Sequence, residues 1–238
     1  MAERGIHIVR AHLAKLPPSE SLTIAERRAQ YERAENVFPT PAEVKVERVT
    51  APTAPAEWLR PPSAAPGRVV LYLHGGGYVI GSPRSHRHLA AAIATAAGSS
   101  ALLLEYRCAP EAPFPAAVDD AVAAYRWLLD QGVSASGIVI AGDSAGGGLT
   151  VATLLALRDA RLPLPAAGVC ISPWVDLTCR GASYATKAAT DPIVKRAGVH
   201  EMARAYLGTA DARTPLASPL FADLRGLPPL LIQVGSEE

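Results

Sequence analysis

The chain has 238 residues, with 23 Lys and Arg against 22 Asp and Glu and a formal net charge of +1. A balanced charge without a basic cluster argues against nucleic acid as a partner, because binding nucleic acid requires many neutralised phosphates. Apolar residues make up 49% of the chain, yet no window approaches the roughly 20 uninterrupted apolar residues of a membrane span. We therefore expect a soluble protein that neither binds nucleic acid nor spans a membrane.

Two helices are expected before the first strand. The start, "MAERGIHIVRAHLAKLPP", has apolar residues at helical spacing rather than in the solid block of a signal peptide, namely Ile6, Val9, Leu13 and Leu16. Thr23 is followed three residues later by Glu26, a capping box that predicts a helix to about Asn36.

The middle of the chain alternates between strands and helices. "VKVERVTA" and "AEWLR" predict an antiparallel pair at a sheet edge. Five later apolar runs predict strands that are covered on both faces, at 68–77, 99–107, 137–144, 166–174 and 228–235. Helical stretches separate them, at 86–97, 116–131 and 145–160. This alternation predicts an α/β fold with a mainly parallel sheet and helices on both faces.

The segment 177–215 breaks this rhythm, because an irregular stretch and one helix replace a simple crossover. We interpret it as an insertion that forms a lid. The predicted organisation is therefore a pair of N-terminal cap helices in residues 1–40, a core formed by 41–176 and 216–238, and a cap insertion at 177–215.

The cysteines carry no sign of a metal site. Cys108, Cys170 and Cys179 are odd in number and lack metal-type spacing, which suits reduced thiols in a cytosol. Buried small apolar residues are the favoured interpretation. We expect no metal, no cofactor and a cytoplasmic location.

The stretch "IVIAGDSAGGG" places Ser144 between glycines, directly after a buried strand and before an Ala-rich and Leu-rich helix. A nucleophilic serine on a strained turn needs this context, since a Cβ at Gly142 or Gly146 would collide with neighbouring backbone. The Ala145 N–H then faces a developing oxyanion. A phosphate-binding turn or a plain helix N-cap is the alternative interpretation.

A second glycine cluster, "LYLHGGGYVIGS", also follows a strand. Gly76 and Gly77 can turn their N–H groups toward the carbonyl oxygen that Ser144 attacks. A nucleotide-binding loop is the alternative, but the GxGxxG spacing and a Walker lysine are absent. The two clusters together favour acyl transfer.

The segments "HGGGYVIGS", "EYRCAPEAPFPAAVDDAVAAYRWL", "GDSAGGGL" and "SPWVDLT" resemble the hormone-sensitive lipase family of α/β-hydrolases. The resemblance runs from about Val69 to Glu238 and implies an α/β-hydrolase core with a helical cap and no cofactor. It implies Ser144 as the nucleophile and Gly76, Gly77 and Ala145 as the oxyanion hole. It also implies cleavage of short- to medium-chain esters. Relatives often form a homodimer through the C-terminal edge of the sheet, a part that we expect to lie beyond residue 238, so the oligomeric state is open. Cys108 departs from the aliphatic residue that is common in the family.

The rest of a catalytic triad is harder to place. The resemblance puts the carboxylate at Glu238, with Glu237 one residue early. Of the histidines His7, His12, His74, His86, His88 and His200, only His200 follows Ser144. The resemblance gives His74 a role in shaping the glycine loop, and we expect His86 and His88 to be solvated at a helix start.

Two explanations for the missing base are open. Asp176 with His200 has the chain order of a triad, but His200 lies in the expected lid. The favoured explanation is that the histidine, the last strand and the last helix lie beyond residue 238.

These observations predict a serine carboxylesterase that acts on small esters or lactones. A ligand-binding protein on a hydrolase scaffold, or an inactive truncated form, is the alternative, because no suitable histidine is present.

Overall fold

The computed structural model describes residues 7, 9–11, 13 and 21–238. Its centre is a seven-stranded sheet in the order β1-β2-β4-β3-β5-β6-β7. β1 (Lys45–Thr50) and β2 (Pro55–Arg60) pair antiparallel, and β2 pairs antiparallel with β4. The other strands run parallel, which are β3 (Val69–Leu73), β4 (Ser100–Leu104), β5 (Ile138–Asp143), β6 (Ala167–Ile171) and β7 (Leu230–Gln233). The predicted edge pair and parallel sheet are confirmed.

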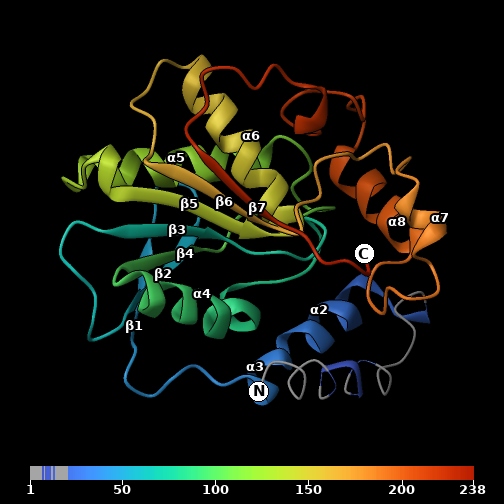
Figure 1. Ribbon diagram of the computed structural model, residues 1–238, viewed down its shortest axis with the longest axis horizontal. Helices are drawn as coiled ribbons and strands as arrows, with labels where there is room; N and C mark the ends of the chain where they lie inside the picture. Colours follow the sequence, from blue (N-terminus) through green and yellow to red (C-terminus); the bar gives the residue numbers. More distant parts are fainter. Residues whose placement is uncertain (1–6, 8, 12, 14–20) are drawn as a thin grey trace.

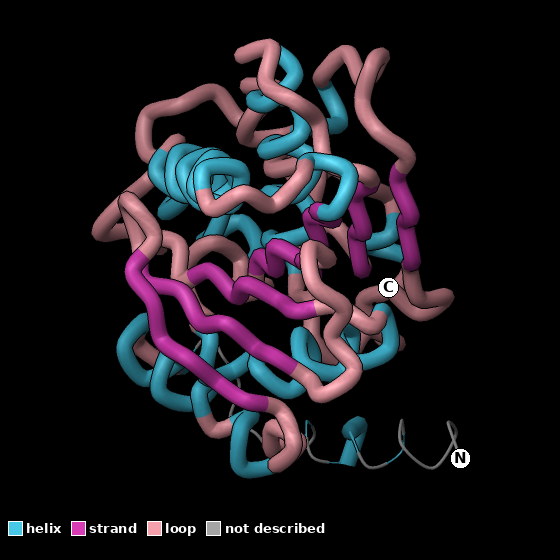
Figure 2. The backbone as a smooth tube through the Cα atoms, turned by 90° about the vertical axis from the view of Figure 1, so that its left-hand side faces the viewer, coloured by secondary structure: helices cyan, strands magenta, loops and turns pink. Residues whose placement is uncertain are grey.

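Helices cover both faces of this sheet, as the alternating pattern predicts (Figures 1 and 2). α4 (Pro83–Ala97) packs on one face, and α5 (Ala116–Asp130) and α6 (Ala145–Asp159) lie on the other. The strand side chains alternate between two apolar clusters. Val70 and Tyr72 of β3 belong to the cluster on the α4 side, whereas Leu71 and Leu73 belong to the larger cluster on the opposite side. This double burial explains why the central strands are continuously apolar.

α4 begins three residues earlier than the sequence predicts. Ser82 is its N-cap and accepts a hydrogen bond from the Arg84 N–H, while Pro83 occupies the first turn. Both are known signals for a helix start.

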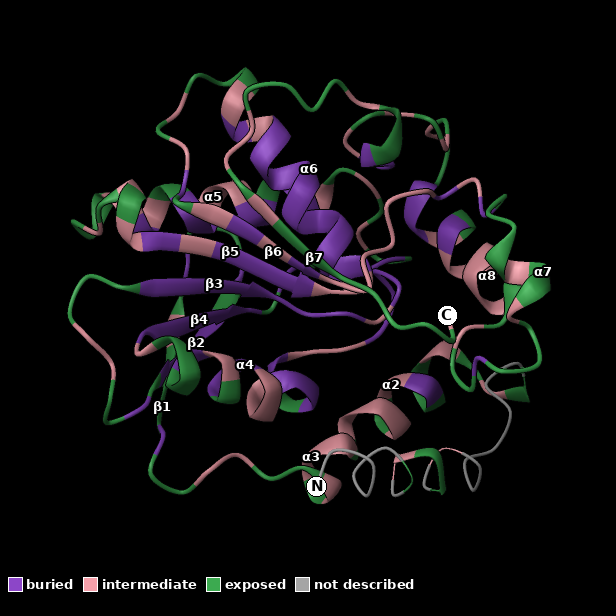
Figure 3. Cartoon of the chain, in the orientation of Figure 1, coloured by how far each residue is buried: buried purple, intermediate pink, exposed green. Residues whose placement is uncertain are grey.

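The predicted burial of the last strand is wrong. Leu231 and Ile232 of β7 are 62% and 56% exposed, whereas the strands at the centre of the sheet are buried (Figure 3). Among the described strands, β7 lies at the edge of the sheet and pairs with β6 alone. A continuous apolar run does not distinguish an edge strand from a central one, which is why the sequence pattern overestimates its burial.

Short helices gather at the carboxyl ends of the parallel strands (Figure 1). They are α2 (Ile24–Glu32), α3 (Ala34–Val37), α7 (Ser183–Thr186) and α8 (Arg196–Leu207). The capping box of Thr23 and Glu26 is present at the start of α2. Two 3-10 turns, η2 (Ala135–Gly137) and η3 (Pro219–Phe221), complete the described elements.

The expected first helix lies mostly outside the described residues, Ile6 and Leu16 included, although Val9 and Leu13 are helical. Within the described ranges, we find no helix whose length and hydropathy would suit a bilayer crossing.

Candidate active site

Ser144 occupies the turn between β5 and α6. Its backbone has φ 50° and ψ −117°, a conformation that non-glycine residues rarely adopt. Backbone hydrogen bonds fix the turn, because the Ser144 N–H donates to the Ile171 carbonyl at 2.9 Å and the Ser144 carbonyl accepts from the Trp174 N–H at 2.8 Å. The strained turn that the sequence predicts is therefore present, and Ser144 itself is half-buried rather than enclosed.

The glycines around this turn are there because neighbouring backbone leaves no room for a side chain. A Cβ on Gly142 would overlap with the Gly146 carbonyl, and a Cβ on Gly146 would overlap with the Leu73 carbonyl. The collision predicted at both positions is confirmed. Close contact between β3, β5 and the first turn of α6 is what holds Ser144 at the end of the sheet.

The second glycine cluster forms a tight turn directly after β3. Gly76 and Gly77 have φ values of 115° and 61°. The N–H groups of Val79 and Ile80 both donate to the Gly76 carbonyl, at 3.1 and 2.9 Å. We call residues 74–81 the oxyanion loop, for the role that the sequence predicts for them.

Three backbone N–H groups near Ser144 have no hydrogen-bond acceptor within the described part of the chain. They belong to Gly76, Gly77 and Ala145. Gly76 and Gly77 line the same cavity as Ser144, and Ala145 opens α6 directly after it. Donors held in this way are what a developing oxyanion requires.

The cavity at Ser144 has a volume of about 540 Å³. Ser144, Gly76 and Gly77 lie on its wall, and Tyr31 of α2 contributes from the N-terminal side. Much of the remaining wall is apolar and comes from the 177–215 segment, from α6, from β7 and from the residue after β7, including Val151, Ile193, Val194, Val199, Met202, Ile232 and Val234. Met202 of α8 packs close to Gly77, where a Cβ would overlap with its sulfur. The cavity therefore suits an apolar chain next to Ser144.

Glu238 lies on the wall of this cavity. Its carboxylate accepts a hydrogen bond from the Ser172 hydroxyl at 2.6 Å and another from the Gly235 N–H. Glu237 instead pairs with Arg10 at 3.1 Å. Of the two carboxylates at this end of the chain, Glu238 is the one placed for chemistry at the cavity, and its catalytic role stays a prediction.

The alternative pair of Asp176 and His200 is not brought to Ser144. Neither residue is on the cavity wall. Asp176 accepts hydrogen bonds from the N–H and the hydroxyl of Thr178, at 2.8 and 2.6 Å, and so stabilises its own turn. His200 lies on α8, and the described residues of the wall include no histidine.

The expectation that His86 and His88 are solvated is wrong for His86. His86 is only 5% exposed, and its Nε2 lies 3.4 Å from an Asp143 carboxylate oxygen. His88 is half-buried and stacks on Phe38, with ring centroids 5.0 Å apart. His86 is buried because α4 turns this face toward the carboxylate of Asp143.

Asp143 is a residue that the sequence interpretation missed. One carboxylate oxygen accepts from the Tyr72 hydroxyl at 2.8 Å and from the Gly75 N–H at 3.0 Å. Burial alone raises the pKa of this carboxyl, but hydrogen bonds from His86 and Tyr72 and the nearby imidazoles hold the pKa below its usual value. Asp143 stays ionised and ties the strand before Ser144 to the oxyanion loop. Its position next to Ser144 in "GDSAG" was the available signal.

His74 lies beneath the oxyanion loop. Its Nδ1 is 2.8 Å from the Gly75 carbonyl, its ring stacks on Tyr106 with centroids 4.1 Å apart, and the Tyr106 hydroxyl donates to the His74 carbonyl at 2.7 Å. Because a carbonyl only accepts, Nδ1 carries the proton. Burial lowers the pKa of His74 from 6.5 to about 3. A neutral imidazole that supports the loop agrees with the role implied by the resemblance.

This pKa predicts a dependence of stability on pH. Below pH 6.5 the unfolded chain binds a proton at His74 that the folded protein excludes down to about pH 3. Stability from this group is therefore complete above pH 6.5, and it falls by up to about 1.4 kcal/mol per pH unit as the pH is lowered. We expect urea unfolding between pH 7 and 4 to show this slope, and the slope to be shallower in His74→Gln. Equal slopes in the two proteins would contradict it.

The three cysteines are free. Burial raises the pKa of Cys108 to about 12 and that of Cys170 to about 11, which leaves both as unreactive thiols. Among the residues that the structure describes, no cluster of His, Cys, Asp or Glu could hold a metal ion.

The sequence matches a family of known proteins over most of its length. The model of the family described as alpha/beta hydrolase fold matches residues 70–238. An acetyl-hydrolase of Streptomyces hygroscopicus is 52% identical over 238 residues, covering 100% of this chain and 79% of that protein. A putative acetyl-hydrolase of Mycobacterium tuberculosis, LipR, is 40% identical, covering 92% of this chain and 71% of that protein.

Solved structures agree with this assignment. An esterase from the bacterial hormone-sensitive lipase family superposes with a TM-score of 0.93 at 51% identity, covering 99% of this chain and 78% of that one. EstE5, soaked with p-nitrophenyl butyrate, has a TM-score of 0.93 at 48% identity, covering 98% and 79%. With its strained serine, its glycine loop and these relatives, the chain belongs to the hormone-sensitive lipase family of α/β-hydrolases.

Proposed function

We propose that this carboxylic ester hydrolase is a serine carboxylesterase that acts through an acyl-enzyme on Ser144. One observation carries the proposal: a strained serine lies on the wall of an apolar cavity, beside three backbone N–H groups without an acceptor in the described residues. The relatives are named as acetyl-hydrolases and esterases, which supports hydrolysis over a ligand-binding role or an inactive form on the same scaffold.

In the proposed reaction, the Ser144 Oγ attacks the ester carbonyl and loses its proton to a base. The carbonyl oxygen becomes an oxyanion that accepts hydrogen bonds from Gly76, Gly77 and Ala145. These donors need no reorganisation during the step, and each contributes about 3 kcal/mol of transition-state stabilisation. The ester C–O bond then breaks, and the base gives the proton to the leaving oxygen, which departs as the alcohol. The acyl group left on Ser144 is hydrolysed by water in a second step.

Ser144 needs a base that takes its proton. In this fold a histidine takes the serine proton while a carboxylate orients the imidazole. Glu238 is our proposed carboxylate, because it lies on the cavity wall with its charge held by Ser172 and Gly235. No histidine lies among the described residues of that wall. The turnover number of this chain therefore measures how effectively its own residues accept the Ser144 proton.

The cap helices are proposed to select the acyl group. α2 in the 1–40 region and α8 in the 177–215 insertion are joined by Arg27, which pairs with Glu201 at 2.9 Å. Tyr31 of α2 and Met202 of α8 both line the cavity, so the cap contributes to its wall together with the core formed by 41–176 and 216–238. A cavity of about 540 Å³ with an apolar wall suits esters or lactones with short to medium chains.

The proposal also covers the location, the substrates and the assembly of this enzyme. All three cysteines are free, and burial raises the pKa of each thiol, which suits a reducing cytoplasm. We propose small esters or lactones as the substrates, with no cofactor and no nucleic acid, and a homodimer as the assembly.

The acyl preference tests this function. We expect kcat/KM to be highest for p-nitrophenyl butyrate or octanoate, and to fall at least about tenfold for the palmitate ester, which exceeds the cavity. Initial rates across this series, measured below the solubility limit of each ester, check the expectation. A rate that is indifferent to chain length, or that persists in Ser144→Ala, would contradict catalysis in this cavity.

A further inference from the structure

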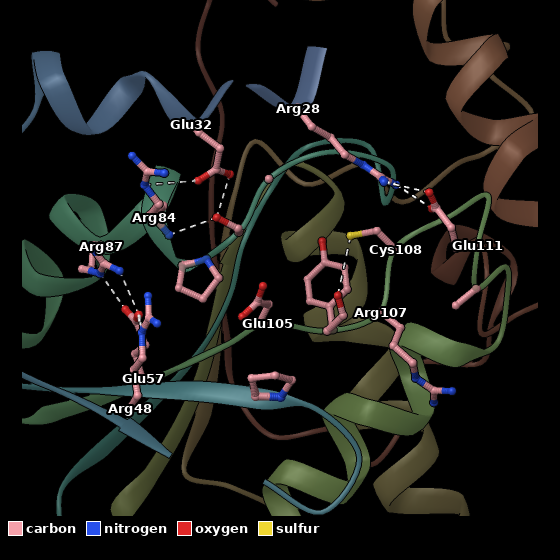
Figure 4. A pocket seen from close by; sticks show the side chains of 16 residues that line it. Arg28, Glu32, Arg48, Glu57, Arg84, Arg87, Glu105, Arg107, Cys108 and Glu111 are labelled. Carbon is pink, nitrogen blue, oxygen red and sulfur yellow. Dashed lines mark hydrogen bonds and ion pairs between the residues drawn. The ribbon is translucent and has the colours of Figure 1, made fainter. Parts of the chain in front are cut away.

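A second cavity of about 690 Å³ lies away from Ser144, between α2, α4 and the segment that follows β4 (Figure 4). Arginines and glutamates dominate its wall, and most of them neutralise one another. Arg87 pairs with Glu57 at 2.6 Å, and Arg28 pairs with Glu111 at 2.7 Å. The balance of charge leaves little attraction for an ionic ligand. Its arginines are instead notable for what they hold in place.

Arg28 makes more directional contacts than an ion pair requires. Its Nε donates to the Val79 carbonyl at 2.8 Å, and one terminal nitrogen donates to the Ala109 carbonyl at 2.8 Å. The two terminal nitrogens also donate to the two oxygens of Glu111, at 2.8 and 2.7 Å. A planar guanidinium supplies these fixed donor directions, which a lysine ammonium cannot reproduce. The side chain is 34% exposed, so the carbonyl contacts rather than burial define its position.

The Val79 carbonyl belongs to the turn that presents the oxyanion donors. The N–H of Val79 donates to the Gly76 carbonyl, and the Ala109 N–H donates to the Tyr78 carbonyl at 2.8 Å. Arg28 bridges the same two segments through the Val79 and Ala109 carbonyls. The oxyanion loop is therefore joined to the 105–111 segment by one backbone hydrogen bond and by the Arg28 side chain of the cap helix α2.

The neighbouring residues of α2 have different partners. Arg27 contacts the other cap helix through Glu201, whereas the contacts of Arg28 are all made to the core. Tyr31, about one turn later on α2, lines the catalytic cavity. One helix thus lines the catalytic cavity through Tyr31 and contacts the oxyanion loop through Arg28.

We propose that Arg28 is a positioning residue, which fixes the Gly76–Gly77 donors through the Val79 carbonyl and links the cap helix α2 to the oxyanion hole. This inference rests on the proposed esterase function. It assigns Arg28 no contact with substrate. Its removal should weaken transition-state stabilisation more than substrate binding, because the donors act on the oxyanion rather than on the ground-state ester.

The test compares Arg28→Ala and Arg28→Lys with Arg33→Ala. Arg33 is the exposed C-cap residue of α2, so its removal takes the same charge from the same helix. We expect Arg28→Ala to lower kcat for p-nitrophenyl butyrate about tenfold with KM changed less than about twofold. Arg28→Lys should fall between the two, and Arg33→Ala should match the wild type. Added ethylguanidinium should restore part of the kcat of Arg28→Ala alone.

Amide hydrogen exchange provides a readout that does not depend on turnover. The Val79 and Ile80 amides, which close the oxyanion loop, should exchange at least about fivefold faster in Arg28→Ala and Arg28→Lys than in Arg33→Ala. Unchanged exchange at both amides, or a rise in KM without a fall in kcat, would overturn the proposal. Absence of any Ser144-dependent turnover in the wild type would refute the esterase function instead, and the exchange rates would still decide the role of Arg28.

Discussion

Replacing Ser144 with alanine is expected to lower kcat/KM for p-nitrophenyl butyrate by about 10³-fold or more where a base takes the serine proton, since only the oxyanion donors and substrate binding are then left. The nucleophile is lost while the cavity and the three N–H groups stay in place. Initial rates of p-nitrophenol release, corrected for spontaneous hydrolysis, measure this loss.

Two substitutions at this position separate chemistry from folding. Alanine adopts the same strained backbone as serine, so the free energy of unfolding should change by less than about 0.5 kcal/mol. Glycine at φ 50° removes strain, worth about 1–3 kcal/mol, and loses about 1 kcal/mol to chain entropy. Ser144→Gly should therefore be inactive and at least as stable as the wild type. A Ser144→Ala protein that hydrolyses the ester at the wild-type rate would place the nucleophile elsewhere.

Replacing Gly146 with alanine is expected to lower the free energy of unfolding by about 3 kcal/mol or more, a large effect for one methyl group. The new Cβ would overlap with the Leu73 carbonyl, which is backbone and cannot rotate away. β3 would have to separate from the first turn of α6, and Ser144 would move with it. Urea unfolding measures the change as a shift of midpoint at constant slope.

Gly198 is the matched control, since it lies in the helix α8 with open space around its Cβ position. Gly198→Ala should stabilise the protein by about 0.5–1 kcal/mol through helix propensity alone. The two substitutions add the same methyl group to a helix, so opposite signs isolate the close approach at Gly146. A loss of similar size in both proteins would contradict this explanation.

The sequence predicts the parts of this fold that depend on local pattern. The capping box at Thr23, the apolar strands and the glycines at 142 and 146 each follow from neighbouring residues. The exposure of β7 could not be predicted in this way, because an apolar run carries no information about its position in the sheet.

In the candidate site too, local motifs predict some residues and miss others. Ser144, Gly76 and Gly77 are found from motifs, and the structure brings them to one cavity. The contact between Asp143 and His86, and the reach of Arg28 to Val79, join residues 57 and 51 positions apart. Tertiary packing decides such contacts, so no local pattern shows them. The burial of His86 was misjudged because the helix pattern shows only neighbouring residues, whereas its partner Asp143 lies on the distant strand β5.

In the proposed mechanism, Ser144 faces three backbone donors aimed at an oxyanion. A crystal structure of the chain after reaction with a phosphonate ester tests it most directly, because the tetrahedral phosphorus stands in for the attacked carbonyl carbon. We predict a covalent bond to the Ser144 Oγ and a phosphonyl oxygen within about 3 Å of the N–H groups of Gly76, Gly77 and Ala145. An adduct on another residue, or a phosphonyl oxygen turned away from these three groups, would contradict this arrangement of nucleophile and donors.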